Sequence, residues 1–331
     1  MGGAAAAASN AASVRRRSPW RRLLELGVTA LVTVFILRRV GVDLTTLGRL
    51  DLSAWEPSPL PLLGSVLVLA SGYLVSASLW GRLVRELGGP RLELGTSVPL
   101  FMVANLGRYV PGKVIQIAGL TWLARRRGVP APVAAGAAIL GQGVALLGAT
   151  ILGLAAFFSP ALDPAYRLWG WSGLVGATTF VVLTSLPGPA ARLERGWFRL
   201  AGGTPPPSET DPVSRAGFGL RWTTLYVLNW SLYAVAFWLL YLGLAGWAPF
   251  LYVGPAFAAA YVGGYLALFA PAGLGVREGL LAAFLAPVLE PEGALALAVV
   301  ARIWATAVEV IPAGLMTPGV LRSARTDAGG A

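Results

Sequence analysis

Long apolar stretches separated by arginines constrain this chain more than any other feature. Several windows of about 20 residues contain few or no charged side chains, and a helix of that length spans roughly 30 Å of hydrocarbon. The 331 residues are 56% hydrophobic and only 12% charged, whereas a soluble domain has about 25% charged residues. The sequence therefore predicts an all-α, polytopic integral membrane protein.

The charged residues are strongly biased toward arginine. The chain has 26 basic and 15 acidic residues, and Lys113 is its single lysine. The positive-inside rule explains such an excess in a membrane protein, so we expect no nucleic-acid partner. The chain contains no His and no Cys, which excludes disulfides, imidazole bases, thiolate nucleophiles and the usual ligands of zinc, haem and iron–sulfur clusters. We therefore expect neither a metal nor another cofactor.

Six apolar segments are long enough to predict full membrane spans. They lie at about 23–37, 60–80, 133–158, 168–186, 220–244 and 294–316. Together they predict one transmembrane domain over residues 20–320, with a first half at 20–158 and a second half at 168–320. We expect a disordered, basic cytoplasmic tail at 1–19 and a short cytoplasmic tail at 321–331.

A seventh apolar region, at about 94–123, is interrupted by charge and by Pro111-Gly112. Proline removes a backbone donor and glycine permits unusual backbone angles, so a regular helix cannot continue here. A broken, charged segment at membrane depth is costly and is typical of a cavity or a transport pathway. The candidate substrate-binding residues of this segment are Asn105, Arg108, Tyr109, Lys113 and Gln116.

A second broken region, at about 250–288, has the same design. Pro271, Gly273 and Gly275 interrupt an apolar run, and Arg277 and Glu278 then open a new helix. Each break leaves backbone N–H groups free next to cations, which together suit a phosphate group. An alternative is that Arg277 and Glu278 form a structural ion pair that only pins the loop.

The distribution of basic residues predicts the topology. If both broken regions are re-entrant and both termini are cytoplasmic, 18 basic residues lie inside and 4 lie outside. Treating both regions as ordinary spans is the main competitor, and it fits less well because it places Arg125, Arg126 and Arg127 outside. In the preferred topology the first pair dips in from the cytoplasm and the second from outside, which predicts an inverted repeat.

Three further polar residues lie inside predicted spans and complete the candidate site. Arg302 and Glu309 are seven residues apart and share one helix face, and Gln142 lies in the middle of its span. Such residues rarely face lipid. Glu309 and Glu278 are candidates to neutralise Arg302 and Arg277 or to carry a proton. The alternatives are interhelical packing for these three residues, and snorkelling to the interface for the cations of the first break.

The second broken region resembles a known family. Its pattern P-x-G-x-G-x-R-E, from Pro271 to Glu278, is similar to a signature of the lysylphosphatidylglycerol synthase transmembrane (flippase) superfamily. The stretch from Asn105 to Gln116 is similar to an earlier element of that family. The resemblance covers about residues 20–320 and implies an all-helical membrane domain. The better-understood members of the family move aminoacylated phospholipid between leaflets, and their relatives handle other membrane lipids.

Three departures from the family pattern qualify what the resemblance implies. The sequence has no counterpart of the soluble aminoacyl-transferase domain, so synthase activity is not implied. Many members carry Glu at the position of Gln116, and Glu-Arg at the position of Gln142-Gly143. Without these charges, the resemblance does not imply that this chain shares the substrate or the proton coupling of those members.

We weigh three functions for this sequence: a transporter, a non-catalytic partner and an enzyme. The one it favours is a lipid transporter or flippase for an anionic or phosphate-bearing lipid, in a bacterial cytoplasmic (inner) membrane with both termini in the cytoplasm. The alternative is a non-catalytic membrane partner that positions a lipid-modifying enzyme or glycosyltransferase. An enzyme is not expected, because no nucleophile–base pair is evident.

Overall fold

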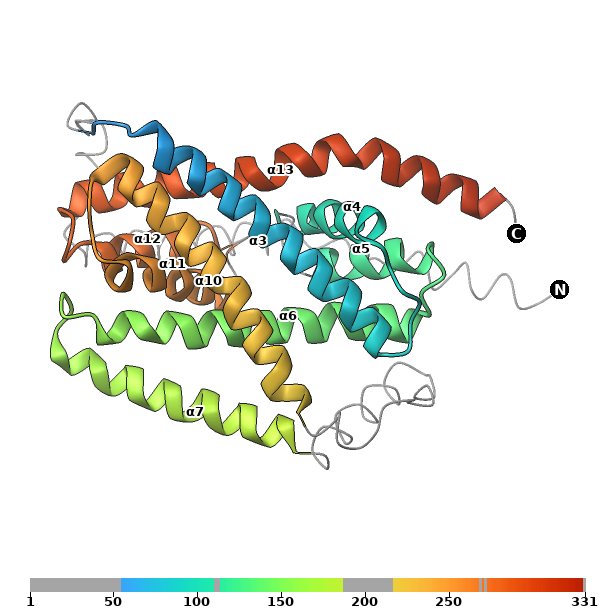
Figure 1. The fold of residues 1–331 in the computed structure, drawn as a ribbon, viewed down its shortest axis with the longest axis horizontal. Coiled ribbons are helices and arrows are strands. Elements are labelled where there is room, and N and C mark those ends of the chain that lie inside the picture. The colour runs from blue at the N-terminus through green and yellow to red at the C-terminus, as the bar shows by residue number, and fades with distance from the viewer. Residues whose placement is uncertain (1–54, 110–113, 187–216, 268–269, 271–272, 330–331) are drawn as a thin grey trace, which may run out of the picture.

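The computed structural model describes residues 55–109, 114–186, 217–267, 270 and 273–329, with side chains described up to Arg322. Within these ranges the chain forms α-helices and short 3₁₀ turns and contains no strand, which confirms the all-α prediction. Most of the long helices run lengthwise and lie side by side (Figure 1). The predicted tail at 1–19 and the predicted span at 23–37 lie outside the described residues.

Five helices are long and apolar enough to cross a membrane, which confirms a polytopic membrane protein. They are α3 (Pro59–Glu86), α6 (Ala131–Leu154), α7 (Arg167–Ser185), α10 (Phe218–Ala245) and α13 (Pro291–Gly329). The mean hydropathy of their most apolar windows lies between 1.2 and 1.9. Each coincides with one of the predicted spans.

The two regions with Pro-Gly interruptions are broken helices in the structure. In the first, α4 (Leu94–Asn105) continues into a 3₁₀ turn (Leu106–Tyr109), and α5 (Val114–Arg125) follows. In the second, α11 (Phe250–Leu266) ends well before α12 (Val276–Leu285) begins. The helix-breaking residues Pro111, Gly112 and Pro271 lie outside the described residues, as does Lys113.

Glycines shape the second break. Gly273 and Gly275 have φ angles of 71° and 78°, in the left-handed region that other residues rarely adopt. A Cβ atom on Gly273 would lie 2.6 Å from the carbonyl oxygen of Gly264 in α11. The chain therefore turns back directly against α11, and only glycine fits at this approach.

Helices α3 and α10 form an antiparallel pair along their whole lengths. The backbone N–H of Ser58, which precedes α3, donates to Gly243 O near the end of α10 at 2.8 Å. At the other end of the pair, the carboxylate of Glu86 accepts a hydrogen bond from Trp222 Nε1 at 3.1 Å and contacts Arg221. Figure 1 shows the two helices crossing the molecule together.

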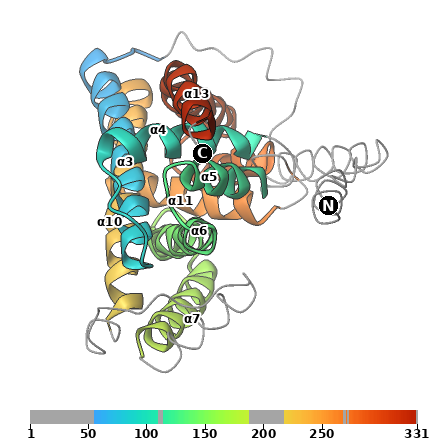
Figure 2. The same cartoon turned by 90° about the vertical axis from the view of Figure 1, so that its right-hand side faces the viewer.

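Helix α6 packs closely against α10 and α11 through small residues. A Cβ atom on Gly148 would lie 2.8 Å from the backbone of Tyr226, and one on Gly153 would lie 2.7 Å from the backbone nitrogen of Ala259. Small residues allow such close approach in lipid. Helix α7 lies at the periphery of the bundle, as the end-on view shows (Figure 2).

The two halves repeat the same order of elements. A long helix is followed by a short helix with an internal proline (Pro99 in α4, Pro255 in α11), a break, a second short helix and another long helix. The α4–α5 pair lies in one half of the long axis and the α11–α12 pair in the other (Figure 1). The equivalent helices α3 and α10 are antiparallel, as an inverted repeat requires. The re-entrant topology and the inverted repeat stay predictions.

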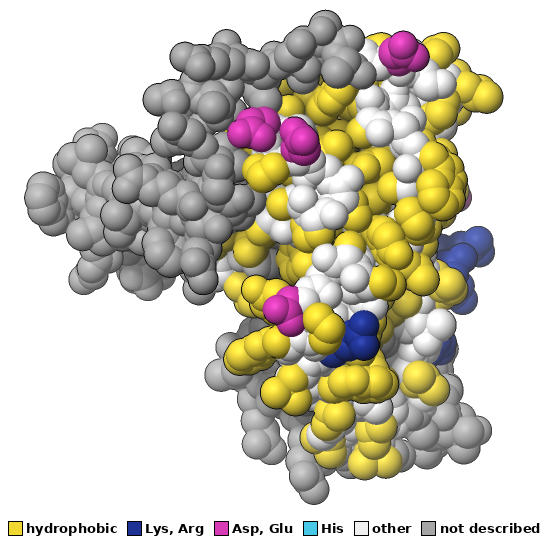
Figure 3. All heavy atoms as spheres, turned by 90° about the vertical axis from the view of Figure 1, so that its left-hand side faces the viewer, with side chains coloured by type: hydrophobic (Ala, Val, Ile, Leu, Met, Phe, Trp, Pro, Cys, Tyr) yellow, Lys and Arg dark blue, Asp and Glu magenta, His cyan; other side chains and the backbone are white. Residues whose placement is uncertain are grey.

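Charged side chains differ between the two ends of the long helices. One end, where α3 and α5 end and α10 begins, carries mainly arginine: Arg82, Arg85, Arg91, Arg125, Arg126, Arg127, Arg221 and Arg322, with Glu86 and Glu93. The other end is mainly acidic and carries Glu56, Asp163, Glu290 and Glu292, with Arg167. Figure 3 faces this second end, where acidic groups stand apart on a largely apolar surface.

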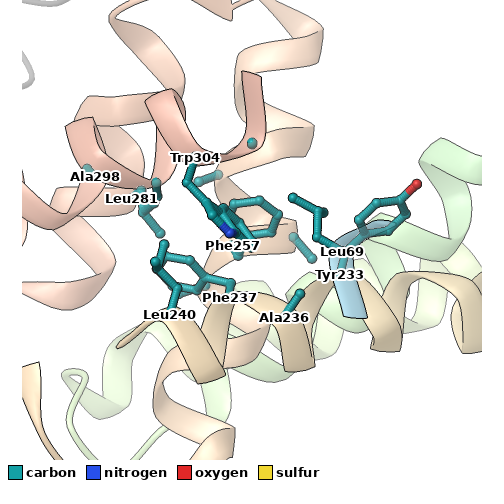
Figure 4. Close-up of a cluster of buried hydrophobic side chains, with 14 of the residues drawn as sticks. Leu69, Tyr233, Ala236, Phe237, Leu240, Phe257, Leu281, Ala298 and Trp304 are labelled. Carbon is teal, nitrogen blue, oxygen red and sulfur yellow. The ribbon is translucent and has the colours of Figure 1, made fainter. Parts of the chain in front are cut away.

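An aromatic core joins the second half of the bundle together. The ring of Phe257 in α11 stacks on Phe237 of α10 with centroids 4.9 Å apart, and it meets Trp304 of α13 edge-on at 6.1 Å (Figure 4). Leu281 of α12 is buried in the same cluster. This core holds α10, α11, α12 and α13 in fixed relative positions next to the second break.

Helix α13 extends further than the predicted span at 294–316. It runs through Pro312 and Pro318 and continues to Gly329. Prolines are tolerated inside such helices when neighbouring groups satisfy the freed backbone carbonyls. The predicted cytoplasmic tail at 321–331 is therefore helical through Gly329.

Candidate functional site

A cavity of about 130 Å³ lies between the helices, large enough for several water molecules. Its wall is built by α3, α4, α5, α6, α10, α11, α12, α13 and the 3₁₀ turn, and α7 contributes no residue to it. Eight of the predicted site residues line this one cavity: Asn105, Arg108, Tyr109, Gln116, Gln142, Arg277, Arg302 and Glu309. Both broken regions therefore meet at a single polar space.

A side-chain hydrogen bond spans the first break. Gln116 Nε2, in the first turn of α5, donates to Oδ1 of Asn105, the last residue of α4, at 2.7 Å. The backbone is also tightly packed here, because a Cβ atom on Gly107 would lie 2.7 Å from the backbone nitrogen of Gln116. These contacts fix how the 3₁₀ turn presents Arg108 and Tyr109 to the cavity.

The cation of the first break is paired with the last helix. Arg108 Nη2 lies 2.5 Å from Glu309 Oε1 in α13. The two atoms form an ion pair, and Glu309 Oε1 accepts no hydrogen bond. The other carboxylate oxygen of Glu309, Oε2, accepts a hydrogen bond from Tyr109 OH at 2.8 Å. The Glu309 side chain is only 1% exposed, compared with 21% for Arg108. A buried carboxylate of this kind needs both partners.

The acidic residue of the second break stabilises its own helix. Glu278 Oε2 accepts a hydrogen bond from the backbone N–H of Gly275 at 2.6 Å, which caps the first turn of α12. A carboxylate at a helix N-terminus also interacts favourably with the helix dipole. Its other oxygen, Oε1, lies 3.6 Å from Arg302 Nε of α13, at ion-pair distance.

Arg277 has a different environment from the other two arginines. Its guanidinium carbon lies 4.7 Å from the ring centroid of Phe257 and 5.4 Å from that of Tyr261. It forms no ion pair with any carboxylate in the described part of the chain. Gly264 of α11 makes room for it, since a Cβ atom there would lie 2.7 Å from Arg277 Cβ. Aromatic faces therefore hold this cation, and no described carboxylate forms an ion pair with it.

The sequence suggested different partners for these charges. It offered an Arg277–Glu278 ion pair as an alternative, and it matched Glu278 and Glu309 to Arg277 and Arg302. In the structure Glu309 pairs with Arg108 and Glu278 pairs with Arg302. The reason is that Glu278 turns back to cap its own helix, while Arg277, the preceding residue, points to α11.

Helix α13 connects the two breaks. Arg302 and Glu309 share one face, as their spacing predicts, and Glu309 reaches the first break while Arg302 reaches the second. The guanidinium of Arg302 also lies 5.8 Å from the ring centroid of Tyr109. One helix therefore contacts both broken regions through a cation and an anion two turns apart.

A wall of tyrosines and amides was missed by the sequence reasoning. Asn229 Nδ2 of α10 donates to Ser76 Oγ of α3 at 2.7 Å, and Ser76 Oγ lies 2.9 Å from Tyr233 OH, where either hydroxyl can donate. The sequence signal that could have found this wall is that α3 and α10 each carry polar side chains near their middle. The cavity-lining residues of this wall are Tyr73, Ser76, Tyr226, Asn229, Trp230, Tyr233, Tyr261 and Tyr265.

Two predicted site residues are not placed in the cavity wall. Glu278 lies next to Arg277 and Arg302, which do line the cavity. Lys113 lies outside the described residues, so its predicted place near Arg277 stays a prediction. Gln142 does line the cavity, from α6.

A model of the lysylphosphatidylglycerol synthase TM region matches residues 22–313, which is most of the chain. The chain belongs to this family. The resemblance seen in the sequence is thereby confirmed, and it makes the chain a membrane protein related to lipid handling. A comparison with curated proteins finds no match. Within the matched range, the predicted site residues Gln116 and Gln142 both line the cavity.

Proposed function

We propose that this protein is a flippase-like lipid transporter, and that its cavity takes the phosphate-bearing head group of an anionic lipid. One observation carries the proposal. Both broken helices face a single cavity, and Arg277 enters it without a carboxylate partner among the described residues. An uncompensated cation at membrane depth is costly unless it serves a ligand or a pathway. A phosphate group would compensate it.

The geometry of Arg277 favours a phosphate over a simple halide. A guanidinium is planar and can bind two phosphate oxygens with parallel N–H donors. The guanidinium carbon lies over the rings of Phe257 and Tyr261, which hold the group in place. Arg302 of α13 supplies a second cation at the same cavity.

Transport rather than catalysis fits the acidic residues. Glu309 contacts both Arg108 and Tyr109, and Glu278 contacts Gly275 and Arg302. Both carboxylates therefore hold the broken regions in place, which supports a structural role. Among the described residues, no group of three His, Cys, Asp or Glu could hold a metal ion. We propose that the protein is not an enzyme.

The charge difference between the two ends supports an orientation in a bacterial inner membrane. The arginine-rich end, where α3 and α5 end, would face the cytoplasm under the positive-inside rule. The α4–α5 pair would then enter from the cytoplasm and the α11–α12 pair from the opposite face. Both termini would be cytoplasmic. Alternating opening of two such pairs around one fixed site is a known transport design.

Reconstituted vesicles test the proposal. The expected result is leaflet transfer of acyl-labelled phosphatidylglycerol by the wild-type protein, at a rate well above that of protein-free vesicles. Folded protein that transfers no anionic lipid would contradict it. If such inactive protein binds the lipid and co-purifies with a lipid-modifying enzyme, the alternative role as a non-catalytic partner is favoured.

A further inference from the structure

The described charged groups around the cavity do not cancel. Arg108, Arg277 and Arg302 face Glu278 and Glu309, so three cations and two anions leave a net charge of +1. An excess of cations at membrane depth is costly unless a ligand or a pathway uses it, so these side chains favour an anionic ligand. A phosphodiester, which carries a charge of −1, is such a ligand.

A cationic part of a head group finds no partner here. Glu309 is 1% exposed and is already shared by Arg108 and Tyr109. Glu278 is engaged by the backbone of Gly275 and by Arg302. A lysyl or ethanolamine ammonium group would therefore add positive charge to a site that is already positive.

Three of the aromatic rings in the cavity wall already lie against the protein's own cations. Such recognition requires a cation placed over an open aromatic ring. Arg277 already lies over Phe257 and Tyr261, and Arg302 lies near the ring of Tyr109. A choline group would therefore have to compete with the protein's own guanidinium groups for these three rings.

The rest of the wall is uncharged and rich in hydroxyl groups. Tyr233 and Ser76 share a hydrogen bond in which either can donate, and Asn229 donates to Ser76. Reversible donors of this kind can receive or give a hydrogen bond to ligand hydroxyls. Tyr73 and Tyr265 add aromatic surface against which C–H groups of a polyol can pack.

We infer that the lipid carries a monoanionic phosphodiester whose remaining head group is uncharged and hydroxylated, such as glycerol or a sugar. The site discriminates against ammonium-bearing head groups, including aminoacylated ones. This inference rests on the proposed transport function and narrows it. It separates the chain from a transporter of cationic, aminoacylated lipid.

A panel of acyl-labelled lipids in one preparation of wild-type proteoliposomes tests the charge requirement. We expect phosphatidylglycerol to be transferred at least about tenfold faster than phosphatidylcholine or lysyl-phosphatidylglycerol, which is about 1.4 kcal/mol in discrimination. Ammonium-bearing lipid that moves as fast as phosphatidylglycerol would overturn the inference while leaving transport intact. Absence of transfer for every lipid would instead overturn the proposed function. Because the label is on an acyl chain, soluble phosphate esters do not contribute to the signal.

Phosphatidylmethanol tests the hydroxyl requirement, because it has the charge of phosphatidylglycerol and lacks its hydroxyl groups. We expect phosphatidylglycerol to be transferred at least about threefold faster, and Tyr233→Phe to reduce that ratio. Tyr241→Phe is the matched control, since Tyr241 is a buried tyrosine of the same helix that does not line the cavity. Equal rates for the two lipids in the wild-type protein would refute the hydroxylated head group.

Discussion

The two broken regions share one design and differ in the partners of their cations. At the first break, Arg108 is neutralised by Glu309 at 2.5 Å, and Tyr109 binds the same carboxylate. At the second break, Arg277 lies against Phe257 and Tyr261 and has no ion pair with a described carboxylate.

This difference suggests a division of labour. The first break is held to α13 by the short Arg108–Glu309 pair. The second break is held by the backbone cap of Glu278, by close packing of Gly273 on α11 and by the longer contact of Glu278 with Arg302. Arg277 is thereby left available to a ligand. We infer that the first break holds the site together and that the second break receives the substrate.

The largest expected effect is on stability at the first break. Glu309→Gln leaves Arg108 buried without its anion, and removing one partner of a buried pair costs about 3–5 kcal/mol. Glu278→Gln should cost less, about 1–2 kcal/mol, because its ion pair is longer and its amide oxygen can still cap Gly275. Unfolding in detergent micelles measures both. Equal losses would remove the proposed distinction, and the double variant Arg108→Gln with Glu309→Gln should recover much of the loss.

The glycines of the two breaks should differ in how much stability is lost when each is replaced by alanine. Gly273→Ala adds a clash with Gly264 to a left-handed φ angle, and should cost about 2–4 kcal/mol. Gly107→Ala creates only the clash with Gln116, and should cost about 1–3 kcal/mol. Gly143→Ala is the control, because nothing lies within 4 Å of its added Cβ atom. A control that destabilises as much as Gly273→Ala would show that close packing is not the cause.

Variants of Arg277 test whether this residue binds the ligand or stabilises the fold. Arg277→Gln should lower phosphatidylglycerol transfer at least about tenfold, about 1.4 kcal/mol, without lowering the free energy of unfolding, because it removes a cation that has no described counter-ion. Arg277→Lys should give an intermediate rate, since lysine keeps the charge and loses the planar fork. Leaflet transfer and unfolding are measured on the same preparations. A large loss of stability in Arg277→Gln would assign this residue to the structure instead.

The smallest expected effect concerns the side-chain bridge over the first break. Asn105→Ala and Gln116→Ala should show a coupling energy of about 1 kcal/mol in a double-mutant cycle, as a neutral hydrogen bond predicts. Unfolding of the two single variants and the double variant gives this value. A coupling near zero would mean that the 3₁₀ turn is held by its backbone packing alone.

Much of the fold could be predicted from the sequence, because long apolar stretches and Pro-Gly interruptions depend on local chemistry. The five described spans and the two broken regions follow from such patterns. The convergence of Arg108, Arg277, Arg302 and Glu309 at membrane depth followed from the high cost of placing them in lipid.

The pairing of these charges could not be predicted, because it depends on how α13 lies between the two breaks. Glu278 next to Arg277 suggested a local ion pair, and helix capping directs it elsewhere. The tyrosine wall was missed for a similar reason. Ser76, Asn229 and Tyr233 come together only through the antiparallel packing of α3 and α10.

The central claim is that both breaks enclose one hydrated cavity that receives an anionic head group. Thr306 lies on α13 between Arg302 and Glu309 and lines this cavity. Because the chain has no cysteine, Thr306→Cys provides a single site for a charged, water-soluble thiol reagent, and Val182→Cys on the exposed apolar surface of α7 is the control. We expect the reagent to modify Thr306→Cys in phosphatidylcholine vesicles and phosphatidylglycerol to protect it, while Val182→Cys is not modified in either. Modification of Thr306→Cys that phosphatidylglycerol leaves unchanged would contradict the claim.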